Sequence, residues 1–273
     1  MSTQPVRLQR APKRLGGVAG APAFVDGSVA PVLDRTESKT AGLLTAAVGR
    51  AHPVRTFLAG VVLAYLSISG LSILLGLLVT RVILAREGVA GDDEGFVRFL
   101  THHRTGDLTE ASLIGSIMAG GVVLPIIVAV CALAAAAFRQ WRVGAFLIFA
   151  LALESAAYRT TTLVVHRERP TVPRLEHLPA DASYPSGHTA AAIAVYCGLA
   201  LLLTSRVTSR AARWAIWAAA AAVPVYVAFA RMYRGMHHPL DVLGGVVIGI
   251  VALVAMVLIC RAAGRVVPGR YGD

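Results

Sequence analysis

Charged residues are scarce in this sequence. Of 273 residues, only 15% are Asp, Glu, Lys or Arg, whereas 56% are hydrophobic. Soluble domains carry roughly 25% charged residues, which supply the polar surface that faces water. This chain has too few polar residues for such a surface, so we expect a lipid bilayer to be its solvent.

Acidic residues are fewer still, with 15 against 26 Lys and Arg, and the formal net charge is +11. Basic proteins often bind nucleic acid or anionic membranes. Here the Arg residues cluster between apolar runs, few aromatic residues interleave with them, and no zinc-finger or RNA-binding signature is present. The basic character therefore favours a bilayer as partner and argues against nucleic acid.

Cysteines are also few: Cys131, Cys197 and Cys260 each lie within an apolar run. Their spacing matches neither a disulfide framework nor a zinc site, so we expect small buried side chains. The basic start, "MSTQPVRLQRAPKRLGG", lacks a following apolar core and does not resemble a cleavable signal peptide.

Long apolar runs are what the sequence does contain, and each approaches the length of about 20 residues that spans a bilayer. We therefore predict an all-α integral membrane protein with six transmembrane helices in a bundle. Residues 1–56 are expected to be a largely flexible basic tail with a short helix near "TAGLLTAAVGRAH", and 263–273 a short C-terminal tail. Pro224 is expected to kink the fifth span. Within the membrane domain, 57–262, the runs cover 57–82, 112–138, 143–165, 187–205, 213–230 and 241–261.

The distribution of basic residues predicts the orientation of these spans. The N-terminal tail, the second and fourth connections and the C-terminal end carry Arg with little or no acid, so both termini are expected in the cytoplasm. The other three connections mix both signs and are expected to be extracytoplasmic. In the first of them, Phe96, Val97 and Leu100 share a helical face, which indicates either a short interfacial helix or an ordinary polar loop.

Two of the outward connections, "HRERPTVPRLEHLPADASYPSGH" and "ARMYRGMHHPLD", contain most of the reactive side chains. Ser186 and Gly187 begin a span, where unpaired backbone N–H groups and a small side chain favour a bound anion. Arg169 and Arg231 suit forked contact with phosphate. Taken singly, Ser186 could be only a helix cap and Arg169 only an interfacial anchor. Their convergence on one side favours a site.

Histidines complete this predicted constellation. His237 and Asp241 lie four residues apart, so one helical turn would bring the carboxylate beside the ring and leave the other nitrogen as a nucleophile. His188 could then protonate a leaving oxygen. His238 is expected to be an ordinary solvated residue. Glu154, a carboxylate within a span, is expected to matter without touching substrate.

These residues resemble the motifs of the type 2 phosphatidic acid phosphatase superfamily, which includes lipid phosphatases, glucose-6-phosphatase and vanadium haloperoxidases. Arg169-Pro170 ends the first motif, Pro185 to His188 is the intact second motif, and Arg231, His237 and Asp241 have the spacing of the third. The resemblance is close over about 150–262. It implies metal-independent hydrolysis through a phosphohistidine on His237, with Asp241 orienting that ring, His188 as acid and base, and no cofactor. Phosphate would be held by Arg169, Arg231, Ser186 and Gly187.

Two positions depart from that family. Thr162 stands where the family has Lys, and Ala230 where it has Ser. The only lysines, Lys13 and Lys39, lie in the tail. We expect Arg167, rather than Arg159, to supply the missing charge to phosphate.

The resemblance implies a lipid phosphate or polyprenyl pyrophosphate as substrate, hydrolysed at the outer face of a bacterial-type cell membrane. Undecaprenyl pyrophosphate, phosphatidylglycerol phosphate and phosphatidic acid all remain open. So do a lipid phosphotransferase and a weakened lipid-phosphate-binding protein, whereas the apolar spans argue against a soluble haloperoxidase. The sequence leaves the oligomeric state open.

Overall fold

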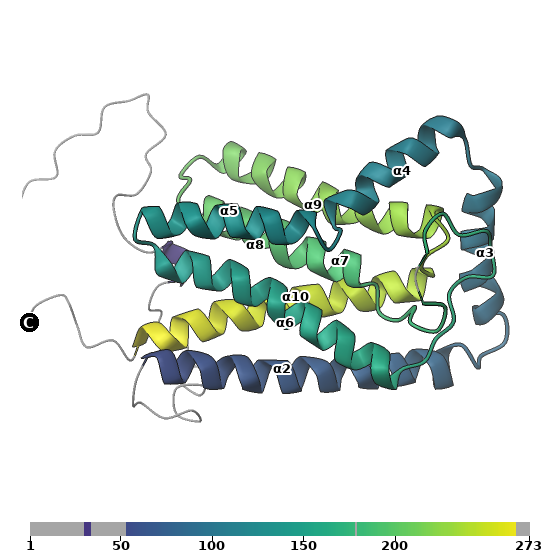
Figure 1. Cartoon of the computed structure of the whole chain (residues 1–273), viewed down its shortest axis with the longest axis horizontal. Coiled ribbons are helices and arrows are strands. Elements are labelled where there is room, and N and C mark those ends of the chain that lie inside the picture. The colour runs from purple at the N-terminus through teal and green to yellow at the C-terminus, as the bar shows by residue number, and fades with distance from the viewer. Residues whose placement is uncertain (1–29, 34–52, 178, 266–273) are drawn as a thin grey trace, which may run out of the picture.

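The computed structural model describes residues 30–33, 53–177 and 179–265, and these form an elongated bundle of helices (Figure 1). No β-strand occurs in these ranges, and one isolated β-bridge joins Arg167 to Ala182. The prediction of an all-α chain is confirmed. The helices are η1 (Pro31–Leu33), α2 (Pro53–Leu78), η2 (Val79–Ile83), α3 (Val89–His102), α4 (Gly106–Met118), α5 (Val123–Ala137), α6 (Trp141–Val164), α7 (Gly187–Ala192), η3 (Ile193–Cys197), α8 (Gly198–Thr204), α9 (Arg210–Tyr233) and α10 (Pro239–Arg265).

Five helical stretches are long and apolar enough to cross a membrane: 53–83, 141–164, 187–204, 210–233 and 239–264. The predicted second span, 112–138, is instead divided between α4 and α5, which are bent by 45°. Gly120 and Gly121 lie at the break, and glycine pairs weaken a helix at such points. Counting this bent pair as one span gives the predicted six. Pro224 lies within α9, which continues through it.

The helix formed by α7, η3 and α8 lies at the centre of the bundle. Of residues 187–204, 61% are buried inside the bundle, whereas only 22% are buried in the most apolar 18 residues of 53–83 and of α9. It packs against α6, α9 and α10, while large apolar side chains on the outer helices remain exposed, as lipid-facing residues would be. The most exposed of these include Leu66, Leu74, Leu133, Leu163 and Trp214.

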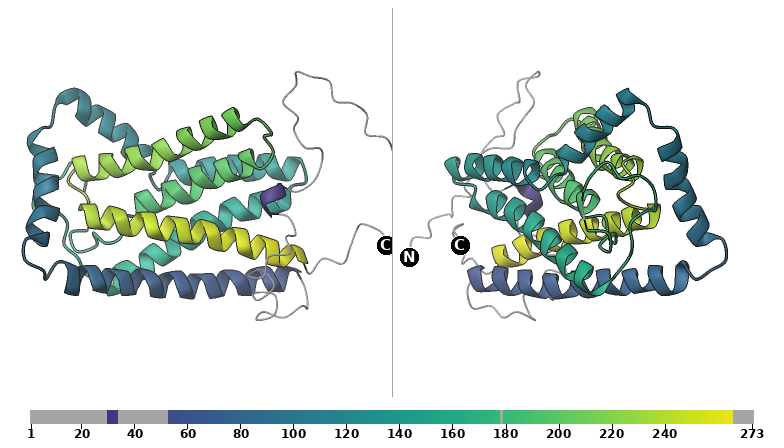
Figure 2. Two further views of the ribbon diagram at one scale, coloured as in Figure 1. Left: turned by 180° about the vertical axis from the view of Figure 1, so that it is seen from behind. Right: turned by 45° about the vertical axis from the view of Figure 1, so that its right-hand side comes forward.

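The start of α2 and the end of α10 lie together at one end of the bundle, opposite the loops that carry the motifs (Figures 1 and 2). At that end Leu33 is fully buried, and Arg261 Nε donates to the Val32 carbonyl at 2.8 Å. Part of the predicted N-terminal tail therefore packs against the bundle. The predicted helix at "TAGLLTAAVGRAH" and most of 263–273 lie outside the described residues.

At the opposite end, α3 runs across the end of the bundle, transverse to the long helices (Figure 1). Of the two structures predicted for this connection, a helix or an ordinary loop, the helix is present. Asp93 and Val97, one turn apart, are buried, whereas Phe96 is 45% exposed. This face brings carboxylates, as well as apolar groups, to the loops that carry the motifs.

Candidate active site

The connection between α6 and α7 folds back on itself and brings the first two motifs together. Arg167 N donates to the Asp181 carbonyl, Ser183 N to the Arg167 carbonyl, and Arg169 N to the Ala180 carbonyl, at 2.8–3.2 Å. The segment that contains Arg169 therefore lies beside the chain that enters the Pro-Ser-Gly-His tetrad.

Glycines on α10 let the tetrad approach the third motif. A Cβ at Gly245 would lie 2.5 Å from the Ser186 carbonyl oxygen, and one at Gly249 would lie 2.7 Å from that of Ala190. Ser186 N also donates to the Asp241 carbonyl at 2.9 Å. Backbone contact, which only glycine permits here, thus joins α7 to the helix that begins beside His237.

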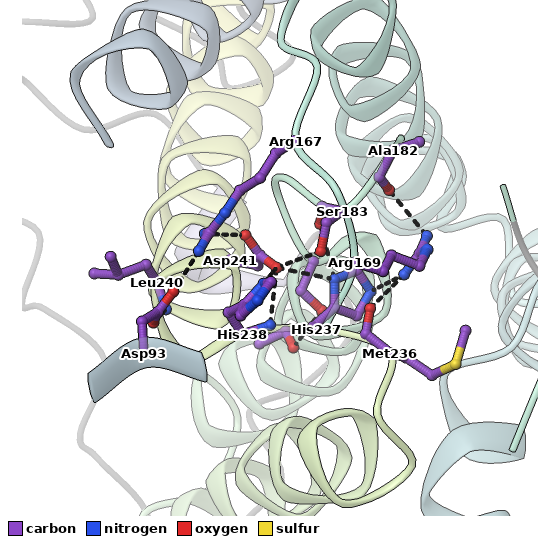
Figure 3. A network of polar contacts seen from close by, with 12 residues as sticks. Asp93, Arg167, Arg169, Ala182, Ser183, Met236, His237, His238, Leu240 and Asp241 are labelled. Atoms are coloured by element: carbon purple, nitrogen blue, oxygen red, sulfur yellow. Dashed lines mark hydrogen bonds and ion pairs between the residues drawn. The ribbon is translucent and has the colours of Figure 1, made fainter. Parts of the chain in front are cut away.

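His237 is 2% exposed, and its tautomer follows from its contacts. Nδ1 lies 2.8 Å from the Ser183 carbonyl oxygen, which can only accept a hydrogen bond. Nδ1 therefore carries the proton in the neutral ring, and Nε2 keeps its lone pair. Nε2 is 3.4 Å from Arg169 Nη1, so the unprotonated nitrogen faces the guanidinium group of Arg169 (Figure 3).

Asp241 supports this arrangement indirectly, through Ser183. Its Oδ2 accepts from Ser183 Oγ at 2.5 Å and from His238 N at 2.9 Å, whereas His237 Nδ1 is 3.7 Å away. We expected a direct carboxylate–imidazole hydrogen bond across a helical turn. His237 instead precedes α10, which starts at Pro239, so the i,i+4 geometry does not apply. Asp241 positions Ser183, whose carbonyl holds the His237 ring. Its negative charge is also close enough to attract the His237 ring when that ring is protonated.

Burial lowers the pKa of His237 to about 4, against 6.5 for a free side chain. Asp241 raises the pKa, but by less than burial lowers it, and the charge of Arg231 lowers the pKa further. The ring is therefore neutral, and Nε2 unprotonated, over the physiological range of pH.

This shift predicts the acid side of the pH profile. If His237 is the nucleophile that the resemblance implies, only its neutral form can attack, so kcat/KM should fall near pH 4 and not near pH 6.5. The folded state binds this proton more weakly than the unfolded chain, so the free energy of unfolding should also fall as the pH drops from about 6.5 toward 4. The measurement is kcat/KM between pH 3.5 and 8. A midpoint near 6.5 would mean that His237 is solvated or is not the group that titrates.

Arg231 is fully buried and only partly satisfied. Its Nη1 pairs with Glu176 Oε2 at 2.7 Å and contacts Ser116 Oγ, but Nε and Nη2 have no hydrogen-bond partner among the described residues. Buried N–H groups of a cation are normally hydrogen-bonded. The two unpartnered groups therefore mark a place where an anion would be bound.

Arg169 is also buried, but it is held by backbone carbonyls. Nε donates to Pro179 O at 2.8 Å, Nη2 to Ala182 O at 2.9 Å, and Nη1 to Met236 O (Figure 3). Burial lowers its pKa, and the nearby Arg231 acts in the same direction. These contacts orient the guanidinium so that Nη1 remains beside His237.

The second motif lies against the same groups. Ser186 is fully buried, with Oγ 3.0 Å from Thr189 Oγ1 and no hydrogen bond that caps α7. Gly187 lies under the Tyr158 ring, where a Cβ would be 3.1 Å from the nearest ring carbon. His188 is within electrostatic reach of His237 and Arg231. The structure thus brings the predicted Ser186, Gly187 and His188 beside the third motif.

Arg167 has different partners from those expected. Its Nη1 pairs with Asp241 Oδ1 and its Nη2 with Asp93 Oδ2, and the residue is only 7% exposed (Figure 3). The side chain is therefore held between two carboxylates, which does not support a contact with phosphate. Arg159 is exposed on α6. Thr162 Oγ1 donates to the Arg159 carbonyl at 2.9 Å.

His238 is not the solvated residue that we expected. It is 7% exposed, with Nε2 3.0 Å from Glu94 Oε2 and Nδ1 3.3 Å from Asp241 Oδ2. The expectation was wrong because α3, which supplies Glu94, lies over this loop. Thr171 Oγ1 and N also donate to Glu94, and these bonds together with His238 lower the pKa of Glu94 although burial raises it.

Glu176 is a further residue that the sequence did not single out. Its carboxylate accepts from Arg231, from Arg234 Nε at 2.6 Å and from Ser116 Oγ at 2.7 Å. Burial alone would raise its pKa, but the charge of Arg231 and these hydrogen bonds lower it to about 2. Only its place in the loop that carries Arg169 could have drawn attention to it.

Two further positions that the sequence singled out, Ala230 and Glu154, are buried. Ala230 is fully buried, and a Cβ at Gly115 of α4 would lie 2.8 Å from the Ala230 Cβ. Glu154 is 1% exposed, with Ser155 Oγ at 3.2 Å from Oε2 and no partner for Oε1 in the described part of the chain.

Comparison with known proteins agrees with the resemblance that the motifs indicated: residues 143–265 match the model of the PAP2 superfamily. Among curated proteins, an undecaprenyl-diphosphatase of Sulfolobus acidocaldarius is 42% identical over 76 residues, which cover 28% of this chain and 32% of the relative. Undecaprenyl-diphosphatase BcrC of Bacillus subtilis is 35% identical over 94 residues, covering 33% and 44%. The matched part is thus less than half of either relative.

A solved structure supports the fold. The chain superposes with a TM-score of 0.61 on the crystal structure of a transmembrane PAP2 type phosphatidylglycerolphosphate phosphatase from Bacillus subtilis. The identity is 21%, and the alignment covers 70% of this chain and 93% of the other.

Proposed function

We propose that this protein is a membrane-embedded hydrolase of a lipid phosphate or lipid pyrophosphate. The observation that carries the proposal is the pair of unpartnered N–H groups of Arg231, buried in a site whose histidine directs an unprotonated Nε2 toward Arg169. A phosphoryl oxygen would satisfy those donors and place phosphorus within reach of the nucleophile. Since both curated relatives are named undecaprenyl-diphosphatase, undecaprenyl pyrophosphate is the first substrate to test.

The proposed reaction has two steps. His237 Nε2 attacks phosphorus, the bond to the leaving oxygen breaks, and His188 gives that oxygen a proton. Water then attacks the phosphohistidine and passes a proton to His188. The N–P bond breaks, and both histidines return to their starting state. Arg169, Arg231, Ser186 Oγ and Gly187 N–H stabilise the charge on the equatorial oxygens, and no metal is needed.

The test is phosphate release by the purified full chain in detergent, with EDTA present. The panel comprises undecaprenyl pyrophosphate, undecaprenyl phosphate, phosphatidylglycerol phosphate and phosphatidic acid. Phosphate release from at least one of them, inhibited by vanadate, is expected. Dependence on added magnesium would contradict the metal-free mechanism. Transfer of phosphate to a second lipid without free phosphate would indicate a phosphotransferase, and no reaction with any of them would indicate a binding protein.

We further propose that both termini are cytoplasmic and that the site faces the extracytoplasmic side of a bacterial-type cell membrane. The Arg-rich connections predict this orientation, and the placement of the start of α2 and the end of α10 at one end of the bundle supports it. In a variant without the three native cysteines, an impermeant thiol reagent should label Asp181→Cys from outside intact cells and should not label Thr208→Cys. The reverse pattern would place the site inside.

A further inference from the structure

Helix α3 lies outside the segment that matches the PAP2 superfamily, 143–265, yet it contributes a buried carboxylate to the site. Asp93 is 6% exposed. Its Oδ2 pairs with Arg167 Nη2, and its Oδ1 accepts from Leu240 N at 3.1 Å, in the first turn of α10 (Figure 3). One side chain therefore contacts both Arg167 and the start of the helix that carries Asp241.

Arg167 is shared between two carboxylates, with one terminal nitrogen for each. Guanidinium groups favour bidentate pairing with a single carboxylate. Because Asp93 engages Nη2, Arg167 contacts Asp241 only at Oδ1. Oδ2 of Asp241 remains available to Ser183 Oγ and His238 N.

Ser183 connects this network to the nucleophile. Its hydroxyl is fixed by Asp241, and its carbonyl accepts from His237 Nδ1 at 2.8 Å. We propose that Asp93 is a positioning residue for catalysis. By drawing Arg167 away from Oδ2 of Asp241, it keeps Ser183 where its carbonyl holds His237 with Nε2 unprotonated and directed toward Arg169. The inference rests on the proposed function of His237 as nucleophile.

Replacement of Asp93 by Asn distinguishes the proposed positioning role from a role that only anchors α3 to α10. An Asn oxygen can still accept from Leu240 N, so the contact of α3 with α10 is kept, whereas the charge opposite Arg167 is lost. Arg167 should then bind both oxygens of Asp241 and compete with Ser183 and His238. The matched control is Asp92→Asn, which makes the same chemical change at the exposed neighbouring position.

The kinetic measurement is kcat and KM for the full chain on undecaprenyl pyrophosphate, or on whichever lipid of the panel reacts. Asp93→Asn should lower kcat by about tenfold to a hundredfold, the range expected for a misplaced reacting group. KM should change less than about twofold, because Arg169 and Arg231 are untouched, and the melting temperature in detergent should be unchanged. Asp92→Asn should behave as wild type. An unchanged kcat in Asp93→Asn, or a fall matched by loss of folded protein, would overturn the proposal.

A second readout does not depend on turnover. In protein labelled with ¹⁵N-histidine, with His237→Ala used to assign the signals, wild-type His237 should show a protonated Nδ1 and an unprotonated Nε2. Asp93→Asn should raise the share of the other tautomer. Unchanged shifts would refute the positioning role whether or not phosphate is released. If the wild type shows these shifts but hydrolyses no lipid phosphate, the proposed function fails and the contact network stands.

Discussion

His237→Ala is expected to abolish phosphate release, leaving turnover lower by a factor of at least about 10³, as the loss of a catalytic nucleophile does in other enzymes. The reason is the position of Nε2, which is unprotonated and faces Arg169 while Nδ1–H is bound to the Ser183 carbonyl. No other described imidazole is held in this way beside Arg169. His238, the adjacent residue, has a carboxylate at each ring nitrogen and cannot substitute.

The control for this variant is His166→Ala, at an exposed position in the connection between α6 and α7. It should keep wild-type activity, and both variants should elute as folded protein in detergent. In a His188→Ala variant, slower hydrolysis should let an acid-labile phosphoenzyme accumulate, and its absence in His188→Ala/His237→Ala would assign the phosphate to His237. Substantial turnover by His237→Ala would exclude the covalent route.

The sequence predicted most of the fold because the bilayer imposes it. A run of about 20 apolar residues has few alternatives to a spanning helix, since backbone groups must be satisfied within the segment. The exception is the second span, where Gly120 and Gly121 separate α4 from α5. Hydrophobicity continues through this break, so an apolar run alone could not reveal it.

The site was predictable to the extent that its motifs are local in sequence. The structure brings His188, Arg231, His237 and Asp241 together, although His237 and Asp241 do not form the direct hydrogen bond that their spacing predicted. The charge partners did not follow from spacing, because Asp93 lies 74 residues from Arg167 and meets it only through the tertiary packing of α3.

The misassigned role of Arg167 has the same cause. Arg167 was expected to bind phosphate because it lies two residues from Arg169. Asp93, which is distant in the sequence, pairs with it instead. Likewise, the orientation of His237 by a backbone carbonyl leaves no mark in the sequence, because every residue at position 183 would supply one. What the side chain of Ser183 adds is the hydroxyl that reaches Asp241.

The second large effect is expected at Arg231, and a pair of identical substitutions isolates its cause. Arg231 and Arg234 both pair with Glu176, and both are buried. All three guanidinium nitrogens of Arg234 donate to protein groups, whereas Nε and Nη2 of Arg231 have no partner in the described part of the chain. Lysine at either position keeps the positive charge and removes the forked N–H donors of the guanidinium group.

Arg231→Lys should therefore lower kcat/KM by about 10²–10³, the cost of removing a donor that stabilises the transition state. Arg234→Lys should cost less than about tenfold, since the nitrogens of Arg234 donate to protein groups, among them Glu176, Ser112 and Leu175. Phosphate release on the best lipid of the panel measures both, with vanadate inhibition as a second readout that should weaken in Arg231→Lys alone. Equal losses in the two variants would mean that the charge cluster around Glu176, and not the free N–H groups of Arg231, determines activity; the anion would then be bound elsewhere in the site.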